Sequence, residues 1–473
     1  MKLHPHGDVS VENTLHHALG PFLVLSRFFG ILPVNGVWPS SDVSQVYFGW
    51  CSPVTLLAFF FIAYSLFDLF LSARFVMERG LKLYTAGPFT FSLICLLAYN
   101  VFLQLSRHWP HLIRHTRQVE AIFLQKSYQN TESKYLSQRI RRYGVVFLIG
   151  AIVEHVTYVS SAMYTNHLHI QHCNLTVSFV ENYFMRERLQ IFSIIEFRLW
   201  LIPLFEWTTI AMTFAWNFVD IFLTLVCLSL ATRFKQMLWR IKGHLNERMP
   251  NEFWAIMRKD LMALIDLLQE MDQKLAGLIL LSCSHNLYSI CTQVYNGFMP
   301  QSNFMNEIYF WFSLIFVLTR ILTMMFVASS IHEATENILS AVYEIPTSHW
   351  CLELKRFNEI ITSDMIAFSG FQFFFVTRRL IFAVSCVDVA LLSLSLSLSS
   401  LSPLLFISFH CVTRGFLLTL TSFIPSFFLF LLPSPPLPFL PNYDNLDFSC
   451  LSDGWQNRHL RVGSNRSSQG SLR

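Results

Sequence analysis

Residues 201–230 read LIPLFEWTTIAMTFAWNFVDIFLTLVCLSL, and Glu206 and Asp220 are the only charged residues among these positions. A helix needs about 20 mostly apolar residues to cross the hydrocarbon core of a bilayer. The stretch therefore predicts a membrane-spanning helix.

The composition of the whole chain points the same way. Of the 473 residues, 53% are hydrophobic and 47 are Phe, whereas charged residues make up only 14%. A globular protein carries about 25% charged residues. A soluble fold could not bury so much apolar surface, and a disordered chain would not carry it. We therefore expect an all-α integral membrane protein.

Hydropathy divides the chain into seven predicted transmembrane helices. Six spans lie near 50–73, 84–106, 143–164, 201–230, 276–299 and 308–330, and the seventh begins at about residue 377. Residues 1–49 precede them as an N-terminal segment. Residues 251–275 place Phe253, Met257 and Leu261 at helical spacing with charged residues opposite, which predicts that span five continues as a helix beyond the membrane.

The basic residues orient the chain. The segments before spans one, three, five and seven carry twenty Lys and Arg residues, and the segments on the other side carry six. Since Lys and Arg are enriched in cytoplasmic loops, we expect a cytoplasmic N-terminus and intracellular helical extensions. The sequon Asn174-Leu175-Thr176 then falls in an outer loop at 165–199, where Asn174 is a candidate glycosylation site.

The same data exclude several functional classes. A net charge of +4 provides no concentrated basic field for nucleic acid. The ten Cys residues form no CxxC pair, so neither a zinc site nor a disulfide framework is indicated, and no removable signal peptide is evident. Because the sequence shows no Ser-His-Asp arrangement, Gly-rich phosphate loop or metal-ligand cluster, we predict a protein that is not an enzyme and needs no metal or cofactor.

Four stretches resemble one protein family. They are FLVLSRFFGILPVNGV at 22–37, SLIFVLTRILTMMFVASSIHEA at 313–334, HWCLELKRFNEII at 349–361 and SGFQFFFVTRRLIFA at 369–383. These stretches are similar to insect gustatory receptors, particularly to the sugar-receptor branch, and the resemblance runs in order from about Leu19 to Val384. It implies a tetrameric, ligand-gated, non-selective cation channel in the plasma membrane of gustatory receptor neurons. Each subunit would hold a sugar pocket in its outer half, around a central pore.

The resemblance also implies the partners: a small-molecule sugar, membrane lipid, and further gustatory receptor subunits that are identical or related. A G-protein-coupled receptor is the alternative, since it too would have seven spans. Its N-terminus would lie outside, however, and its DRY-like end of span three is absent from this sequence. A transporter would show internal repeats and broken Gly/Pro helices, which we do not find.

Polar and aromatic side chains within the predicted spans form the candidate sugar site. An ionisable group in the membrane costs about 2.5–3.5 kcal/mol on insertion scales, so it usually faces protein or water. Sugar hydroxyls need carboxylate or amide partners when they leave water, and the C–H faces of a sugar ring suit flat aromatic side chains. The candidate ligand-binding residues are Asp68, Glu154, His155, Tyr158, Glu206, Trp207, Asn286, Gln293, Tyr309 and Trp311.

Structural interpretations of these polar residues stay open. Ser, Thr and Asn can simply hold transmembrane helices together, and His155 can be a packing histidine rather than a pH sensor. We expect Arg320 of span six to pair with Asp220 of span four.

The sequence departs from the family after Val384. The family continues with a glycine-containing run into a Thr-Tyr signature and a Gln-Phe near the C-terminus, within the helix that lines the pore. Here residues 392–399 alternate Leu and Ser instead, and a tail rich in Ser, Leu, Phe and Pro follows. A translated CT repeat gives this alternation. We therefore interpret residues 50–384 as the receptor-channel core and 385–473 as an aberrant tail, a translated intron. The alternative is a genuine tail with an eighth span near 401–432.

The intron hypothesis predicts the structure of the transcript. Sequencing the message across the Val384 codon should reveal a spliced form that continues directly into a Thr-Tyr signature. An uninterrupted coding message through the Leu/Ser alternation in every transcript would contradict the hypothesis.

Overall fold

A computed structural model describes residues 13–38, 41–80, 83–173, 176–297, 303–363 and 365–380. Within these residues the chain is helical apart from short connections and two isolated β-bridges. Among the described residues, six helices are long and apolar enough to cross a membrane. They are α2 (Pro53–Arg79), α3 (Leu83–Phe123), α5 (Leu136–Cys173), α8 (Ile202–Lys242), α9 (Asn251–Gly297) and α10 (Phe304–Tyr343).

The six helices correspond to the first six predicted spans, but most of them are longer than hydropathy indicated. Helix α9 joins predicted span five and the amphipathic stretch 251–275 into one uninterrupted helix, which confirms the predicted extension. The predicted loop at 165–199 is wrong in part, because α5 continues to Cys173 and the loop also contains α6 (Phe179–Glu187) and α7 (Leu189–Phe192). Asn174 and the predicted seventh span beyond residue 380 lie outside the described residues.

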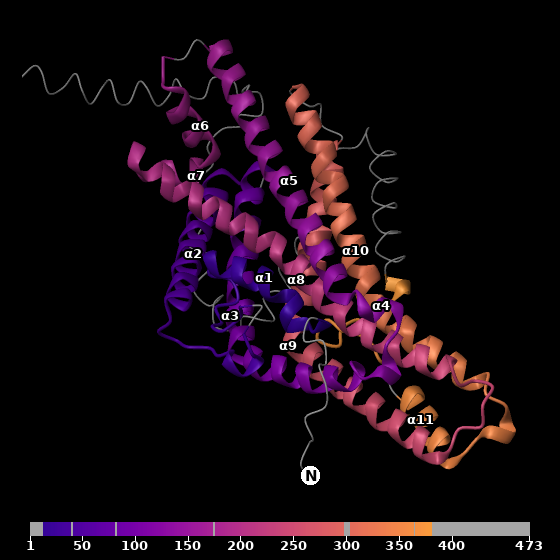
Figure 1. Ribbon diagram of the computed structural model, residues 1–473. Helices are drawn as coiled ribbons and strands as arrows, with labels where there is room; N and C mark the ends of the chain where they lie inside the picture. The colour runs from indigo at the N-terminus through magenta and orange to yellow at the C-terminus, as the bar shows by residue number, and fades with distance from the viewer. Residues whose placement is uncertain are drawn as a thin grey trace, which may run out of the picture. The chain divides into compact units, whose positions relative to one another are not determined.

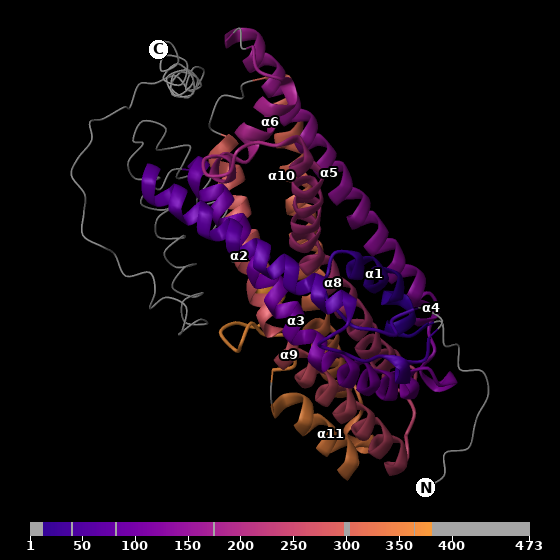
Figure 2. The same cartoon turned by 90° about the vertical axis from the view of Figure 1, so that its left-hand side faces the viewer.

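The described residues form two compact units. Unit 1 takes those within 1–156, 198–300 and 310–410, and unit 2 takes those within 157–197 and 301–309. In unit 1, residues 217–234 of α8 are all buried, with α3 and α9 packed against this helix and α2 against α3 (Figure 1). The short helix α11 (Leu352–Ser363) lies along α9 (Figure 2). The core of unit 1 therefore lies around α8.

Local sequence signals set the ends of α2. Ser52 is the N-cap, and its hydroxyl accepts a hydrogen bond from the Thr55 amide at 3.3 Å, with Pro53 at the first helical position. Pro fits this position because the backbone N–H that it lacks would have no intrahelical acceptor there. Gly80 follows the last helical residue with φ of +79°, a conformation that glycine adopts without steric cost. The sequence therefore specifies where this span begins and ends.

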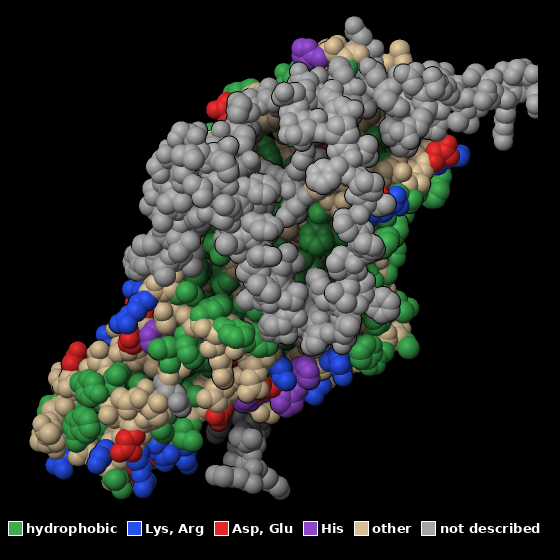
Figure 3. Space-filling view, turned by 180° about the vertical axis from the view of Figure 1, so that it is seen from behind, with side chains coloured by type: hydrophobic (Ala, Val, Ile, Leu, Met, Phe, Trp, Pro, Cys, Tyr) green, Lys and Arg blue, Asp and Glu red, His purple; other side chains and the backbone are tan. Residues whose placement is uncertain are grey.

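Charged side chains gather over the α8–α9 and α10–α11 connections, at the lower left of Figure 3. The exposed basic residues there include Lys242, Arg248, Lys259 and Lys355. Helices α9 and α11 are joined at this end by an ion pair of 2.8 Å between Arg258 Nε and Glu353 Oε2, and by tilted rings of Trp254 and Phe357 with centroids 5.8 Å apart. This charged end is the one that the basic residues predict to be cytoplasmic.

A buried ion pair fixes the short helix α1 (Leu15–Phe28) in unit 1. Arg233 of α8 and Glu120 of α3 are 2.9 Å apart, and their side chains are 1% and 3% exposed. Glu120 also accepts hydrogen bonds from the Leu15 amide at 3.1 and 3.2 Å, while Arg233 donates to the Asn13 carbonyl oxygen at 2.8 Å. Because Glu120 satisfies a first-turn amide of α1, the pair anchors this helix as well as joining α3 to α8.

Removing the carboxylate should therefore release α1. Glu120→Ala leaves Arg233 buried without its charge partner and the Leu15 amide without its acceptor, at an expected cost of about 3–5 kcal/mol. Limited trypsin digestion of the purified protein should then cleave after Arg27 much faster than in the wild type. Glu78→Gln, in an exposed pair with Arg74, is the matched control and should leave the cleavage rate unchanged. Equal cleavage in all three proteins would contradict the anchoring role.

Candidate functional site

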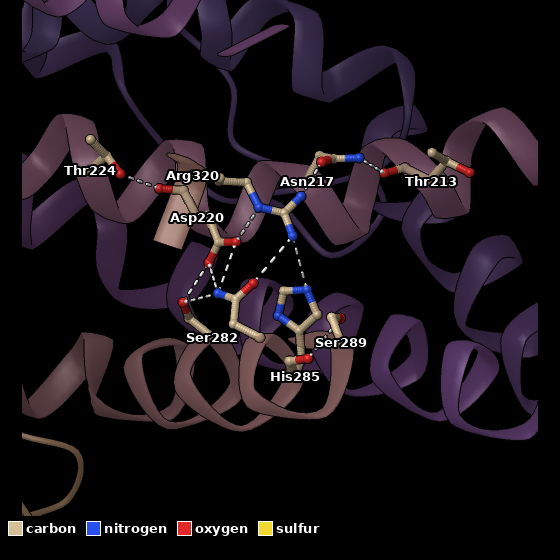
Figure 4. A network of polar contacts seen from close by, with 9 residues as sticks. Thr213, Asn217, Asp220, Thr224, Ser282, His285, Ser289 and Arg320 are labelled. Carbon is tan, nitrogen blue, oxygen red and sulfur yellow. Dashed lines mark hydrogen bonds and ion pairs between the residues drawn. The ribbon is translucent and has the colours of Figure 1, made fainter. Parts of the chain in front are cut away.

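The best-connected polar group in unit 1 is a cluster where α8, α9 and α10 meet, shown in Figure 4. At its centre Arg320 Nε of α10 lies 2.8 Å from Asp220 Oδ2 of α8, with the two side chains 1% and 0% exposed. This ion pair confirms the pairing expected from the sequence. We call the group the Arg320 cluster; its members are Asn217, Asp220, Ser282, His285, Asn286 and Arg320.

Each partner of this ion pair has further hydrogen bonds. Arg320 donates from Nη1 to Asn217 Oδ1, and from Nη2 to Asn286 Oδ1 at 3.2 Å and to His285 Nε2 at 3.4 Å. Asn286 Nδ2 in turn donates to both carboxylate oxygens of Asp220 at 3.1 Å. A buried charge pair stabilises a fold only when its geometry is good and its remaining donors and acceptors are satisfied. In the Arg320 cluster both carboxylate oxygens of Asp220 and both Nη atoms of Arg320 have hydrogen-bond partners, so we interpret it as a structural centre.

A second group, the Glu154 chain, links three helices of the same unit. Gln293 Nε2 of α9 donates to Ser313 Oγ of α10 at 3.0 Å. The Ser313 hydroxyl then donates to Glu154 Oε1 of α5 at 2.8 Å. Ser313 is buried, whereas Glu154 and Gln293 are half-buried. Two residues predicted to bind ligand are thus brought together through a serine that the prediction did not include.

The two groups follow from the same helical spacing. Ser313 and Arg320 are seven residues apart on α10, and Asn286 and Gln293 are seven apart on α9. Seven residues are close to two turns, so each pair lies on one face of its helix. The faces of α9 and α10 therefore meet twice, once through the hydrogen bond from Arg320 to Asn286 and once through the hydrogen bond from Gln293 to Ser313.

Glu206 and His155 form a further half-buried pair of predicted residues. His155 of α5 lies within electrostatic range of Glu206 of α8. The adjacent Trp207 stacks on Phe60 with ring centroids 5.5 Å apart and lies 5.0 Å from Phe61, both on α2. A carboxylate, an imidazole and an exposed aromatic ring thus lie on neighbouring helices of unit 1.

Three other predicted residues lie outside the Glu154 chain and the pair of Glu206 and His155. Asp68 is fully buried in α2 and accepts a hydrogen bond from Ser92 Oγ of α3 at 2.5 Å. Trp311 is 54% exposed and lies edge-on to its neighbour Phe310. Asn286 belongs to the Arg320 cluster, where its amide group bonds both charged partners. A ligand role for these three residues stays a prediction.

Tyr158 and Tyr309 meet in unit 2, with ring centroids 5.6 Å apart. The Tyr158 hydroxyl donates to Glu187 Oε2 of α6 at 2.5 Å. Asn306, near the start of α10, accepts hydrogen bonds from Ser161 and from Thr165, the latter at 3.1 Å. Unit 2 therefore carries its own combination of aromatic rings, a carboxylate and amides. Glu187 and Asn306 were not predicted, because both lie outside the apolar stretches that define the spans.

The sequence is similar to a family of insect taste receptors. The family model described as "Trehalose receptor" matches residues 5–399. The gustatory receptor for sugar taste 64b of Drosophila melanogaster is 30% identical over 372 residues, which cover 78% of this chain and 91% of the relative. The gustatory receptor 5a for trehalose of the same fly is 26% identical over 380 residues, covering 79% and 83%.

The fold is similar to that of solved insect olfactory receptors. The olfactory receptor OR5 from Machilis hrabei superposes with a TM-score of 0.61 at 12% identity, covering 80% of this chain and 96% of that protein. Its complex with eugenol gives a TM-score of 0.56 at 13% identity, covering 83% and 100%. At this identity the likeness shows the fold alone.

The Arg320 cluster generates a stability prediction. Arg320→Met leaves Asp220 buried without its counter-charge, so we expect the free energy of unfolding to fall by about 3–5 kcal/mol. Adding Asp220→Leu should recover part of this loss, because no unpaired charge remains buried. Thermal unfolding in detergent measures both effects, with the exposed Lys242→Met as the control. A melting temperature of Arg320→Met equal to that of the control would contradict the structural role.

Proposed function

Because the chain belongs to the trehalose receptor family, in the sugar branch of the insect gustatory receptors, we propose that it is a gustatory receptor for sugars that works as a ligand-gated, non-selective cation channel. It is a multi-pass membrane protein and a receptor, not an enzyme. In this proposal it acts in the plasma membrane of gustatory receptor neurons, as a tetramer of identical or related subunits with a cytoplasmic N-terminus.

The Glu154 chain is the observation that carries the sugar-binding part of the proposal. A sugar presents several hydroxyl groups, and each can both donate and accept a hydrogen bond. Gln293, Ser313 and Glu154 offer an amide, a hydroxyl and a carboxylate in one line of hydrogen bonds of 3.0 and 2.8 Å. A ligand hydroxyl could take the place of one partner in either of these hydrogen bonds without leaving a buried polar atom unpaired. Exchanging a protein partner for the ligand therefore costs little free energy.

Other contacts supply the remaining chemistry of sugar recognition. Glu206 adds a second half-buried carboxylate, and Trp207 adds an aromatic face that is 38% exposed. In unit 2, Tyr158, Tyr309 and Glu187 repeat the combination of aromatic rings and a carboxylate. We propose that Glu206 and Trp207 contact the sugar together with the Glu154 chain, and that the Arg320 cluster holds the surrounding helices in register without contacting it. The tyrosines and the carboxylate of unit 2 are a separate candidate site within that unit.

Gating requires that the sugar bind the open state more tightly than the closed state. The interaction between sugar and the Glu154 chain would have to differ between the two states, and α9 and α10 both contribute to that chain. A relative displacement of these two helices is therefore the simplest structural change through which sugar binding could open a pore. We accordingly assign the coupling between pocket and pore to the α9–α10 contact.

The proposal predicts separate effects on binding and on delivery to the membrane. Glu154→Ala or Glu206→Ala should weaken sugar binding by about tenfold to a hundredfold, since a hydrogen bond to a charged group contributes about 1.5–3 kcal/mol, while surface delivery persists. Equilibrium binding of labelled trehalose and sucrose to the purified protein, with surface biotinylation in cells, measures both quantities. Ser330→Ala, on α10 but outside the Glu154 chain, is the control. Loss of surface protein in both glutamate variants would favour a structural role instead.

A further inference from the structure

A short hairpin at residues 368–376 precedes the start of the predicted seventh span. Ser369 and Phe375 form an antiparallel bridge. Two further backbone hydrogen bonds close the hairpin: the Gly370 amide donates to Phe374 at 3.0 Å, and the Val376 amide donates to Phe368 at 2.8 Å. Phe371 and Gln372 at the turn have backbone φ angles of +53° and +62°. Residues other than glycine seldom adopt such positive values. Such a turn persists only when surrounding contacts hold it.

Helix α9 holds the first strand of this hairpin. Asp272 accepts hydrogen bonds from the Ser369 amide and the Ser369 hydroxyl, each at 2.6 Å. Five residues further along α9, the space over Gly277 is filled by the Phe371 ring and by Val101 of α3. The hairpin is therefore fixed to one side of α9 by the Asp272 carboxylate and by packing of the Phe371 ring over Gly277.

Helix α10 holds the residue that follows the hairpin. Arg378, two residues past Val376, forms an ion pair with Glu333 of α10. The hairpin is thus attached at its beginning to α9 and, just past its end, to α10. A displacement of α9 against α10 at this level moves Ser369 relative to Arg378 as long as both contacts hold.

The same two helices carry the Glu154 chain. Gln293 lies 21 residues from Asp272 on α9, and Ser313 lies 20 residues from Glu333 on α10. Both helices are uninterrupted over these intervals, so each spans about 30 Å at a rise of 1.5 Å per residue. A continuous helix transmits a displacement along its length, because its backbone hydrogen bonds resist bending.

We propose that Asp272 and Glu333 are positioning residues that convert sugar binding at the Glu154 chain into a movement of the 368–376 hairpin. Sugar changes the hydrogen bonds between α9 and α10 at one end of these helices. The hairpin, held by both helices, moves with the resulting displacement about 30 Å further along them. This inference rests on the proposed function and adds the route by which the pocket is coupled to the gate.

Hydrogen–deuterium exchange on the purified full-length protein tests the inference without requiring a current. In the wild type, saturating trehalose or sucrose should change amide exchange in peptides that cover 366–376 as well as in those that cover 286–297 and 310–320. Asp272→Ala should speed exchange of the hairpin about tenfold without sugar, because its hydrogen bonds to a charged acceptor are lost. The sugar-dependent change at 366–376 should disappear in this variant, while the change at 286–297 remains.

Matched variants separate positioning from general destabilisation. Asp266→Asn removes a charge from an exposed position of α9 and should behave as the wild type. Ser369→Ala and Glu333→Gln keep most packing intact, so each should weaken the sugar response of the hairpin without changing the melting temperature. A response of the hairpin that survives in Asp272→Ala would overturn the inference.

The two possible failures are distinguishable. If sugar changes exchange at 286–297 and 310–320 but never at 366–376 in the wild type, the coupling route is wrong and the proposed sugar receptor stands. If neither sugar changes exchange in any peptide, the proposed sugar binding fails, and the coupling inference fails with it.

Discussion

The contact between Arg320 and Asp220 determines how the central helices pack. Both side chains lie in a region with little water, where an unpaired charge would be costly. The guanidinium group therefore requires a fixed set of acceptors, which Asp220, Asn217, Asn286 and His285 supply from α8 and α9. A slip of one turn in α10 would break this set. Because the Glu154 chain lies two turns away on the same faces, its geometry follows from the register that Arg320 imposes.

Hydropathy and charge predicted the six described spans, their order and the extension of span five. They did not predict how far α3 continues past the apolar stretch. Span two was predicted to end at Ser106, where Arg and His residues follow, yet α3 runs to Phe123. Burial explains the difference, because Trp109, Leu112 and Ile113 are about 1% exposed. Tertiary packing, which no local pattern reveals, maintains the helix there.

The candidate site was predicted only in part, for similar reasons. The pairing of Asp220 with Arg320 could be predicted because two opposite charges in apolar stretches need each other. The contact between Glu120 and Arg233 could not, since both residues lie in segments where charges are ordinarily exposed. Ser313 was missed because one serine in an apolar helix carries no distinctive signal. Asn286 was predicted to bind ligand, and its amide group bonds both charges of the Arg320 cluster; a ligand role for it stays a prediction.

The unbroken course of α9 between Asp272 and Gln293 also restricts how this gene can change. Each residue of an α-helix advances the chain by about 100° around its axis. Deleting or inserting a single codon in this interval would turn the carboxylate of Asp272 away from Ser369, or the amide of Gln293 away from Ser313. Point substitutions on the exposed face of α9 leave both contacts in place. This stretch should therefore tolerate many replacements during evolution but accept no change in length.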